Sequence, residues 1–264
     1  MSKIKISLLI GLASMLLVAC GGGGGGDSSS SSSTTTSYTG KGSSVYNLDW
    51  STHTNPDGSS HQALTGSIIS ETARGATVVP VTYATTANWL TSISTTIAGV
   101  PSGQILNLSA GVTGDAYGVL SAPTSTPNIV ITVSAGNEGT PTLSSGIRSA
   151  LYNSAYKSSL ILVGALDSKG SIASYSSTAG AAADRFVVID GAATGTSYSG
   201  TSYSAPRIAG YAAIIKEKYP NATGEQIASA ILNTAVLQPG WDAATYGRGK
   251  ADLNAALNYL GTPK

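Results

Sequence analysis

Apolar residues along this chain gather in short runs, and four of these runs have the pattern of buried strands. They are ATVVPVTY at residues 76–83, QILNLSAG at 104–111, NIVITVSAG at 128–136 and SLILVGAL at 159–166. Each run is bounded by Gly, Pro, Ser or Asn, which is typical of strands that are covered on both faces. The pattern predicts a sheet at the centre of the molecule.

The stretches between and after these runs have the spacing of helices. In residues 88–100 and 145–156 the apolar residues recur at three and four positions, and residues 202–219 and 224–235 read as two further helices. Because strands and helices alternate, we predict an α/β fold with three layers (α/β/α) and a mostly parallel central sheet. Ligands bind such sheets at the carboxyl ends of the strands, which is where SAGN at residues 134–137 falls.

The turn at residues 220–223 separates the last two of these helices. Asn221-Ala-Thr223 is formally a glycosylation sequon, but Thr223 also stands directly before the helical pattern that begins at Gly224. A threonine at this position accepts a hydrogen bond from an unpaired helix N–H. We therefore interpret Thr223 as a helix N-cap.

The N-terminal residues have the pattern of an export signal. Lys3 and Lys5 precede the apolar run ISLLIGLASMLLVA, which is too short to span a bilayer comfortably. The run ends in LVAC, which resembles the lipobox of bacterial lipoproteins, so we predict a signal peptide at residues 1–19 and lipidation of Cys20. A cleaved signal with a chance cysteine is the alternative. Gly21, rather than an acidic residue, follows Cys20, and in lipoproteins this implies the outer membrane.

Two regions follow the predicted signal peptide. Residues 20–44 are rich in Gly, Ser and Thr and have almost no apolar side chain, which predicts a flexible tether between the lipid anchor and the rest of the chain. Residues 45–264 carry nearly all the apolar and aromatic side chains and are long enough for one domain with a substantial core.

Composition narrows the possible functions. The formal net charge is +1, from 14 basic and 13 acidic residues, which gives no basic surface for nucleic acid. The two histidines and the acidic residues show no metal-ligand spacing, and no acidic cluster matches a calcium loop. We predict no cofactor, although calcium is left unassigned, and we expect a monomer. The single cysteine excludes an intramolecular disulfide.

The sequence GTSYS occurs twice in immediate succession, at residues 195–199 and 200–204. A serine in the first turn of a helix lies near the positive end of the helix dipole, and Gly200 allows the backbone to turn tightly before it. We expect Pro206 to fall within that first turn, where its missing N–H has no intrahelical partner to lose. The alternative is a Gly/Ser/Thr loop that only caps a helix.

The segment GTSYSAPRIAG resembles the nucleophile segment of subtilisin-like serine peptidases, in which Gly, Thr and the reactive Ser open a helix and a proline follows four residues later. Pro206 stands four residues after Ser202, whereas the position four residues after Ser197 is Thr201. The resemblance extends over about residues 45–258. It implies a subtilisin-like fold, here with a shortened N-terminal part, and Ser202 as the nucleophile.

Three more segments match the same family. ITVSAGNEG resembles the segment whose asparagine donates a hydrogen bond to the oxyanion, which implies that role for Asn137; a structural turn is the alternative for Gly-Asn after a strand. LNLSAG resembles the strand that lies along the substrate backbone, and YGRGKADLNAAL at residues 246–257 resembles the closing segment. The resemblance implies substrate-binding residues at Ser109, Ala110, Gly111, Ser134, Ala135 and Gly136.

A serine nucleophile needs a base, and the resemblance implies His61. In the family this histidine starts a helix in the pattern HGTxVA, and HQALTGSII aligns with it, with Gln62 and Ala63 in place of Gly and Thr. Ala63, Gly66 and Ser67 keep small side chains where helix and sheet pack closely. His53 has no such pattern and is interpreted as a surface histidine in a polar loop.

The carboxylate that orients the base precedes the histidine in the subtilisin order. Asp27 lies in the tether and Asp57 in the turn sequence NPDG, whereas Asp49 ends VYNLD, which resembles the first catalytic strand. The resemblance therefore implies Asp49. Ser51 replaces a glycine of the family, and only residues 50–60 separate Asp49 from His61, less than half the usual connection.

The resemblance implies a secreted, lipid-anchored serine endopeptidase of the bacterial cell envelope or the extracellular space, acting on proteins or peptides. Two alternatives stay open. One is an inactive subtilisin-like lipoprotein that binds peptides or serves as a surface module, because fold does not guarantee function. The other is acyl transfer on esters, which uses the same three residues.

Overall fold

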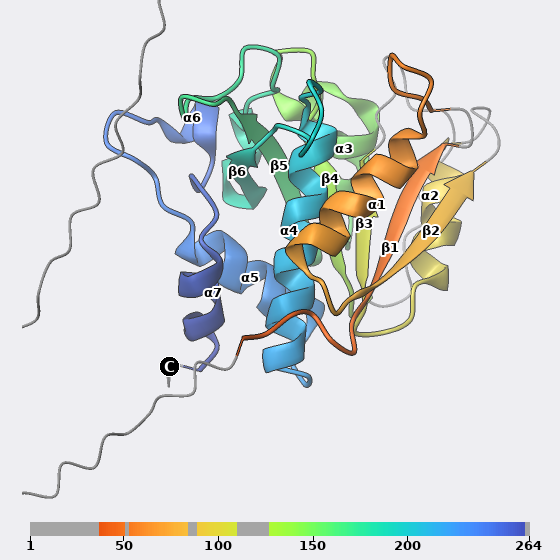
Figure 1. The fold of residues 1–264 in the computed structure, drawn as a ribbon. Helices are drawn as coiled ribbons and strands as arrows, with labels where there is room; N and C mark the ends of the chain where they lie inside the picture. The colour runs from red at the N-terminus through yellow and green to blue at the C-terminus, as the bar shows by residue number, and fades with distance from the viewer. Residues whose placement is uncertain (1–36, 51–52, 84–88, 110–126, 262–264) are drawn as a thin grey trace, which may run out of the picture. The chain divides into compact units, whose positions relative to one another are not determined.

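The computed structural model describes residues 37–50, 53–83, 89–109 and 127–261 (Figure 1). The predicted signal peptide, Cys20, Ser51, and both Ala110 and Gly111 lie outside these ranges. Within them, no helix combines the length and the apolar character needed to cross a membrane.

Six parallel strands form one sheet, in the order β2-β1-β3-β4-β5-β6. Their bounds are β1 Ser44–Trp50, β2 Thr77–Tyr83, β3 Ile105–Leu108, β4 Val130–Ser134, β5 Leu160–Leu166 and β6 Phe186–Asp190. The predicted parallel sheet is confirmed. Strand β6 was not predicted, because its apolar run FVVI is short and charged residues rather than turn residues flank it.

Helices cover both faces of this sheet (Figure 1). They are α1 His61–Thr72, α2 Trp89–Gly99, α3 Gly146–Tyr152, α4 Thr201–Lys218, α5 Gly224–Thr234, α6 Ala243–Tyr246 and α7 Leu253–Tyr259, with short 3-10 turns at 142–144, 157–159 and 180–185. In β5, Leu160 and Leu162 belong to the same core as residues of α2 and α3, whereas Ile161 and Val163 belong to the core that includes α4 and α5. Alternate residues of one strand thus enter two cores, which confirms the three layers.

The N-terminus of α5 bears out the interpretation of Thr223. Its hydroxyl accepts from the N–H of Gln226 at 3.2 Å, and the Gln226 side chain accepts from the Thr223 N–H at 2.9 Å. This reciprocal pair is a capping box, so the side chain of Thr223 has a local structural role.

The last residues of the predicted tether belong to the folded domain. Residues 37–43 are described, and the N–H groups of Thr39, Gly40 and Lys41 all donate to one carboxylate oxygen of Glu217 in α4, at 2.6, 2.6 and 3.1 Å. The tether prediction for residues 20–44 therefore extends too far toward β1, because a polar Gly/Ser/Thr composition does not reveal a distant carboxylate that pairs with its backbone.

Pro206 does not lie in the first turn of α4, contrary to the expectation from the sequence. The helix begins at Thr201, so an N–H at position 206 would donate to the carbonyl of Ser202. Proline leaves that carbonyl without an intrahelical partner. The Ser109 hydroxyl takes its place and donates to the Ser202 carbonyl at 3.0 Å. The proline therefore creates a tertiary link between α4 and the end of β3.

Candidate active site

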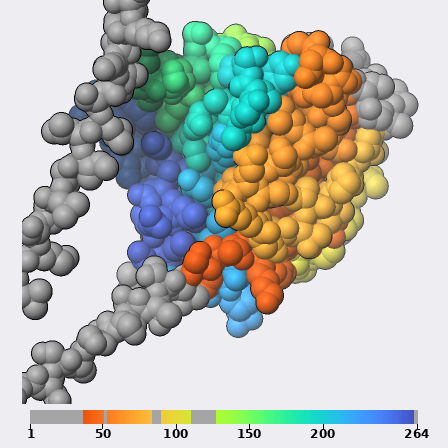
Figure 2. Space-filling view, viewed as in Figure 1, coloured from red at the N-terminus to blue at the C-terminus, as the bar shows by residue number. Residues whose placement is uncertain are grey.

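The candidate residues meet at the carboxyl edge of the sheet. Asp49 stands near the end of β1, Ser109 follows β3 and Asn137 follows β4, and parallel strands bring these ends to one side. A pocket of about 260 Å³ lies there, and its lining includes His61, Asn137 and Ser202. Figure 2 shows α1 in orange against the N-terminal half of α4 in cyan, on one face of the molecule.

The carboxylate of Asp49 contacts the imidazole of His61. Oδ2 of Asp49 lies 2.5 Å from Nδ1 of His61, and both side chains are buried, with exposed fractions of 0% and 5%. His61 is the first residue of α1, where Ser60 is the N-cap and accepts from the N–H of Ala63. Burial raises the pKa of Asp49, but hydrogen bonds from His53 and His61 and the charges of both imidazoles outweigh it, so the pKa lies below its ordinary value.

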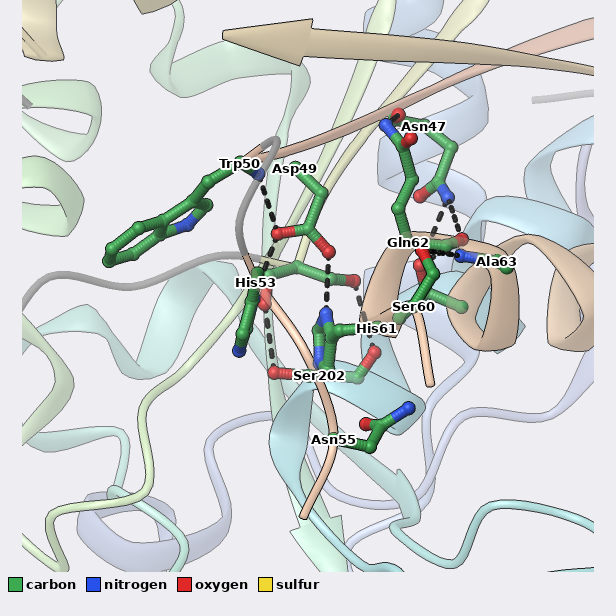
Figure 3. A network of polar contacts seen from close by, with 12 residues as sticks. Asn47, Asp49, Trp50, His53, Asn55, Ser60, His61, Gln62, Ala63 and Ser202 are labelled. Atoms are coloured by element: carbon green, nitrogen blue, oxygen red, sulfur yellow. Dashed lines mark hydrogen bonds and ion pairs between the residues drawn. The ribbon is translucent and has the colours of Figure 1, made fainter. Parts of the chain in front are cut away.

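His53 lies in a loop with 32% of its side chain exposed, in line with the sequence, but it also contacts the candidate site, which the sequence had not indicated. Its Nδ1 lies 2.9 Å from Oδ1 of Asp49, and its ring stacks on that of His61 with 3.8 Å between centroids and 22° between planes. Figure 3 shows dashed lines from the Asp49 carboxylate to both imidazoles. A signal was present in the sequence: the only two histidines of the chain both lie within twelve residues after Asp49.

A hairpin explains how so short a connection joins Asp49 to His61. Thr54 and Ser60 pair as an antiparallel bridge, and the N–H of His61 donates to the carbonyl of His53 at 3.1 Å. The two histidines are therefore opposite each other across the hairpin, which places their rings on the same side. The short connection is compatible with the Asp49–His61 contact without another strand.

Asp57 lies in the predicted turn, at the tip of this hairpin. The N–H of Gly58 donates to the carbonyl of Asn55 at 2.9 Å, and Gly58 has a φ of +82°. The Asp57 carboxylate is exposed and accepts from the N–H and the hydroxyl of Ser59. Asp57 thus has a local role in the turn, and Asp49 is the acid that contacts His61.

Ser202 lies in the pocket beside His61, near the start of α4. Its hydroxyl donates to the carbonyl of Ser109 at 2.8 Å, and the Ser109 hydroxyl donates back to the Ser202 carbonyl. Among the hydrogen bonds of the described residues, none joins Ser202 to His61. Ser197, in the first GTSYS copy, is exposed in the loop that precedes α4 and does not line this pocket.

The side chain of Asn137 has a fixed orientation. Its Oδ1 accepts from both the N–H and the hydroxyl of Thr201, each at 2.9 Å. Since the oxygen is occupied, the amide nitrogen Nδ2 is the end that faces away from Thr201. A Cβ built on Gly200 would lie 3.4 Å from this nitrogen, so Nδ2 lies beside the turn that leads to Ser202.

The predicted substrate-binding residues divide into two groups. Ser134 and Gly136 line the pocket, whereas Ala135 is fully buried and its carbonyl accepts from Thr142 at 2.9 Å. Ser109 is also fully buried, and its hydroxyl and carbonyl both pair with Ser202.

Sequence reasoning missed two charged residues of the pocket, Glu138 and Arg148. Arg148 in α3 is 4% exposed, its Nε donates to the carbonyl of Ser134 at 2.7 Å, and one Nη lies 3.8 Å from a Glu138 carboxylate oxygen. Glu138 follows Asn137 directly in the quoted motif, but nothing in the helical spacing around Arg148 distinguishes it from a surface arginine.

Gln62, which replaces the family's glycine, anchors α1 to the sheet. Its side-chain amide donates to the carbonyl of Asn47 at 3.0 Å and to the carbonyl of Val81 at 2.8 Å. Gly66 approaches the same region, since a Cβ built there would lie 3.5 Å from Val78. Ala63 and Ser67 are exposed, so of the small residues noted in the sequence only Gly66 lies against the sheet.

Asp49, His53 and His61 are also the group with possible metal-ligand atoms within 4.8 Å of one another in the described residues. A metal bound to a histidine lies in the plane of its ring. The two rings here are stacked, so their in-plane lone pairs run side by side instead of converging on one point. The group therefore suits hydrogen bonding to a shared carboxylate better than metal coordination.

Comparisons with known proteins identify related sequences. Residues 10–256 match the Subtilase family. Subtilisin DY from Bacillus licheniformis is 35% identical over 136 residues, which are 48% of this chain and 46% of that protein. Mycosin-4 from Mycobacterium tuberculosis is 40% identical over 67 residues, which are 25% of this chain and 14% of that protein. The chain thus spans less than half the length of these two relatives.

Solved structures show the same fold. A protease from Pseudoalteromonas arctica PAMC 21717 has a TM-score of 0.59 at 18% identity, covering 84% of this chain and 91% of that one. MycP1 with its N-terminal propeptide removed has a TM-score of 0.58 at 21% identity, covering 83% of this chain and 92% of that one. With its parallel sheet, these structural neighbours and a family match over most of its length, the chain belongs to the subtilase family.

Proposed function

We propose that this protein is a serine endopeptidase that hydrolyses peptide bonds with Ser202, His61 and Asp49. The observation that carries the proposal is the buried 2.5 Å contact between Asp49 and His61, in a pocket whose lining also includes Ser202 and Asn137. A serine hydroxyl is a weak nucleophile until a base removes its proton, and an imidazole held by a carboxylate is such a base.

The first step begins with rotation of the Ser202 side chain away from the Ser109 carbonyl. His61 then removes the hydroxyl proton as Oγ attacks the peptide carbonyl, and Asp49 stabilises the imidazolium that forms. The oxyanion accepts hydrogen bonds from Nδ2 of Asn137 and the N–H of Ser202. The occupied Oδ1 of Asn137 supports this role, since it leaves the donor end of the amide available.

The second half of the cycle releases the products. The His61 imidazolium gives its proton to the leaving amine as the C–N bond breaks, which leaves an acyl group on Ser202. A water then loses a proton to His61 and attacks the acyl carbonyl. Its hydroxyl becomes part of the product acid, and His61 returns the proton to Oγ of Ser202.

The location of the enzyme is part of the same proposal. The sequence LVAC and the Gly/Ser/Thr-rich residues after Cys20 support a secreted protein that a lipid on Cys20 holds at the bacterial envelope, with an outer-membrane position implied by Gly21. Mass spectrometry of the N-terminal peptide from the native membrane fraction tests this, since a diacylglycerol-modified Cys20 is expected.

The activity is tested by labelling the purified protein with a fluorophosphonate probe and by hydrolysis of casein and of a p-nitrophenyl ester. Ser202→Ala and His61→Ala are expected to abolish labelling, and Ser197→Ala is the matched control that keeps it. A folded protein without labelling would favour the peptide-binding alternative. Labelling with ester cleavage but no casein cleavage would favour esterase activity.

A further inference from the structure

We infer that His53 is a positioning residue, which shares the Asp49 carboxylate with His61 and holds the His61 ring in place for proton transfer. The inference rests on the proposed function, because it assigns His61 as the base. The carrying observation is one buried carboxylate in contact with two stacked imidazoles.

Both oxygens of the Asp49 carboxylate are occupied by hydrogen-bond partners. Oδ2 of Asp49 contacts Nδ1 of His61, whereas Oδ1 contacts Nδ1 of His53 at 2.9 Å and accepts from the N–H of Trp50 at 2.8 Å. Rotation of the carboxylate about its Cβ–Cγ bond would break all three contacts. Partners on Oδ1 therefore fix the direction in which Oδ2 points, and with it the orientation of His61.

The rings of His53 and His61 are also in direct contact. His53 lies against the face of the His61 ring at 3.8 Å, and the Tyr203 ring is 5.6 Å away from His61 at 42°. A flat neighbour at van der Waals distance opposes tilting of the imidazole. His61 turns as a unit about its side-chain bonds, so the hydrogen bond at Nδ1 and the stack on its face together restrict it.

The backbone of the hairpin holds His53 in place. The hairpin bond from His61 to the His53 carbonyl and the Thr54–Ser60 bridge do not involve the His53 side chain. Asn55 further ties the hairpin to α4, because its Oδ1 accepts from the Tyr203 hydroxyl at 2.9 Å. Replacement of the imidazole is therefore expected to leave the loop in position.

The test separates the hydrogen bond from the stack by three substitutions. His53→Ala removes both, His53→Phe keeps a flat ring without a donor, and His53→Gln offers an amide N–H to Asp49. We expect His53→Ala to lower kcat by about 10- to 100-fold, the size of loss that small misplacement of a reacting group produces, with KM changed much less. His53→Gln is expected to recover most of this loss and His53→Phe less. The rate of fluorophosphonate labelling is expected to fall in the same order.

Ser59→Ala is the matched loop control. It removes the hydrogen bond that the Ser59 hydroxyl accepts from Asn55 and the one that it donates to Asp57, without changing either imidazole, and we expect kcat to be unchanged. Thermal unfolding of every variant checks that the fold is intact. If Ser59→Ala lowers kcat as much as His53→Ala does, His53 is not a positioning residue. The same holds if His53→Ala raises KM and leaves kcat unchanged.

A measurement that does not depend on activity keeps the two proposals distinguishable. In NMR spectra of protein with ¹⁵N-labelled histidine, we expect the Nδ1–H signal of His61 to move or broaden in His53→Ala and to be restored in His53→Gln. An unchanged signal would overturn the inference even in an active enzyme. An inactive wild-type protein would refute the proposed function, and the NMR signals would still decide whether His53 orients His61.

Discussion

At the scale of single residues, a few polar atoms in the site form hydrogen bonds that fix the orientation of a neighbouring side chain. The oxygen of the Asn137 amide is held by Thr201 so that the nitrogen is available, and one oxygen of Asp49 is held by His53 and Trp50 so that the other faces His61. Buried polar groups of this kind contribute by their direction as well as by their charge.

Replacement of Asn137 tests the first of these arrangements. We expect Asn137→Ala to lower kcat by about 100- to 1000-fold with little change in KM, because the lost donor acts on charge that develops only in the transition state. Steady-state hydrolysis of a peptide substrate measures both constants. Thr201→Ser keeps both donors to Oδ1 and is the control, with kcat expected to stay within about twofold of the wild type. A rise in KM with unchanged kcat would mean that Asn137 acts in ground-state binding of the substrate.

The lowered pKa of Asp49 makes the stability of the protein depend on pH. The unfolded chain protonates this carboxylate near pH 3.9, at about the ordinary value, and the folded chain only at a lower pH. The stabilisation is therefore complete above the unfolded pKa and is lost as the pH falls through the folded pKa.

Urea unfolding at a series of pH values between about 2 and 7 measures this effect. The difference in free energy of unfolding between the wild type and Asp49→Asn is expected to shrink as the pH falls below about 4. The other carboxylates are common to both proteins and cancel in the difference. If the free energy of unfolding depends on pH in the same way for the wild type and Asp49→Asn, the contacts with His53 and His61 do not stabilise the ionised form of Asp49.

At the scale of elements, the start of α4 is joined to the end of β3 by the reciprocal pair of Ser109 and Ser202. The proline in the second turn of α4 makes this possible, because it leaves the Ser202 carbonyl free for the Ser109 hydroxyl. The helix that carries the candidate nucleophile is thus placed by a contact to the sheet edge as well as by the packing of its apolar residues.

A double-mutant cycle tests this link. Ser109→Ala leaves the buried Ser202 carbonyl without a partner and is expected to lower the free energy of unfolding by about 1–3 kcal/mol. In a Pro206→Ala background the new N–H pairs with the Ser202 carbonyl. Ser109→Ala is then expected to lower the free energy of unfolding by about 1 kcal/mol less than in the wild type. Urea unfolding of the four proteins gives the coupling. Strictly additive effects would show that the proline and Ser109 act independently.

At the scale of the whole molecule, the sheet gathers residues that are far apart in the sequence. Segments around residues 49, 61, 109, 137 and 202 meet at one edge because all six strands are parallel. The core on one face of the sheet holds both helices that carry these residues, α1 with His61 and α4 with Ser202, in a fixed position relative to the strand ends. The segment before β1 is fastened to the domain by Glu217.

Removal of the Glu217 carboxylate is expected to release that segment. Glu217→Ala leaves three N–H groups without their acceptor, and we expect the amides of residues 39–41 to exchange with solvent at least about tenfold faster. Hydrogen–deuterium exchange measures this, with Glu71→Ala on the exposed face of α1 as the control. Unchanged exchange at residues 39–41 would mean that the other contacts of the segment, among them the N–H of Gly75 to the Thr39 carbonyl and the packing of Tyr38, are sufficient to hold it.

The sequence by itself determined the features that depend on near neighbours. The apolar runs predict four of the six strands and the family resemblance of VYNLD a fifth, NPDG predicts a turn, and Thr223 predicts a helix cap. Motif spacing alone distinguishes Ser202 from Ser197. These signals are local, because strand and helix periods and turn preferences arise from interactions within a few residues.

Only the tertiary structure decided which distant groups touch. It showed that His53 shares Asp49 with His61, that Pro206 frees a carbonyl for Ser109, that Gln62 anchors α1 and that Arg148 reaches the pocket. Each of these contacts depends on strand register, on the path of a loop or on the rotation of a helix. Register, loop path and helix rotation produce no periodic pattern in the sequence. The fold, and not the order of residues along the chain, brings the partners of each contact together.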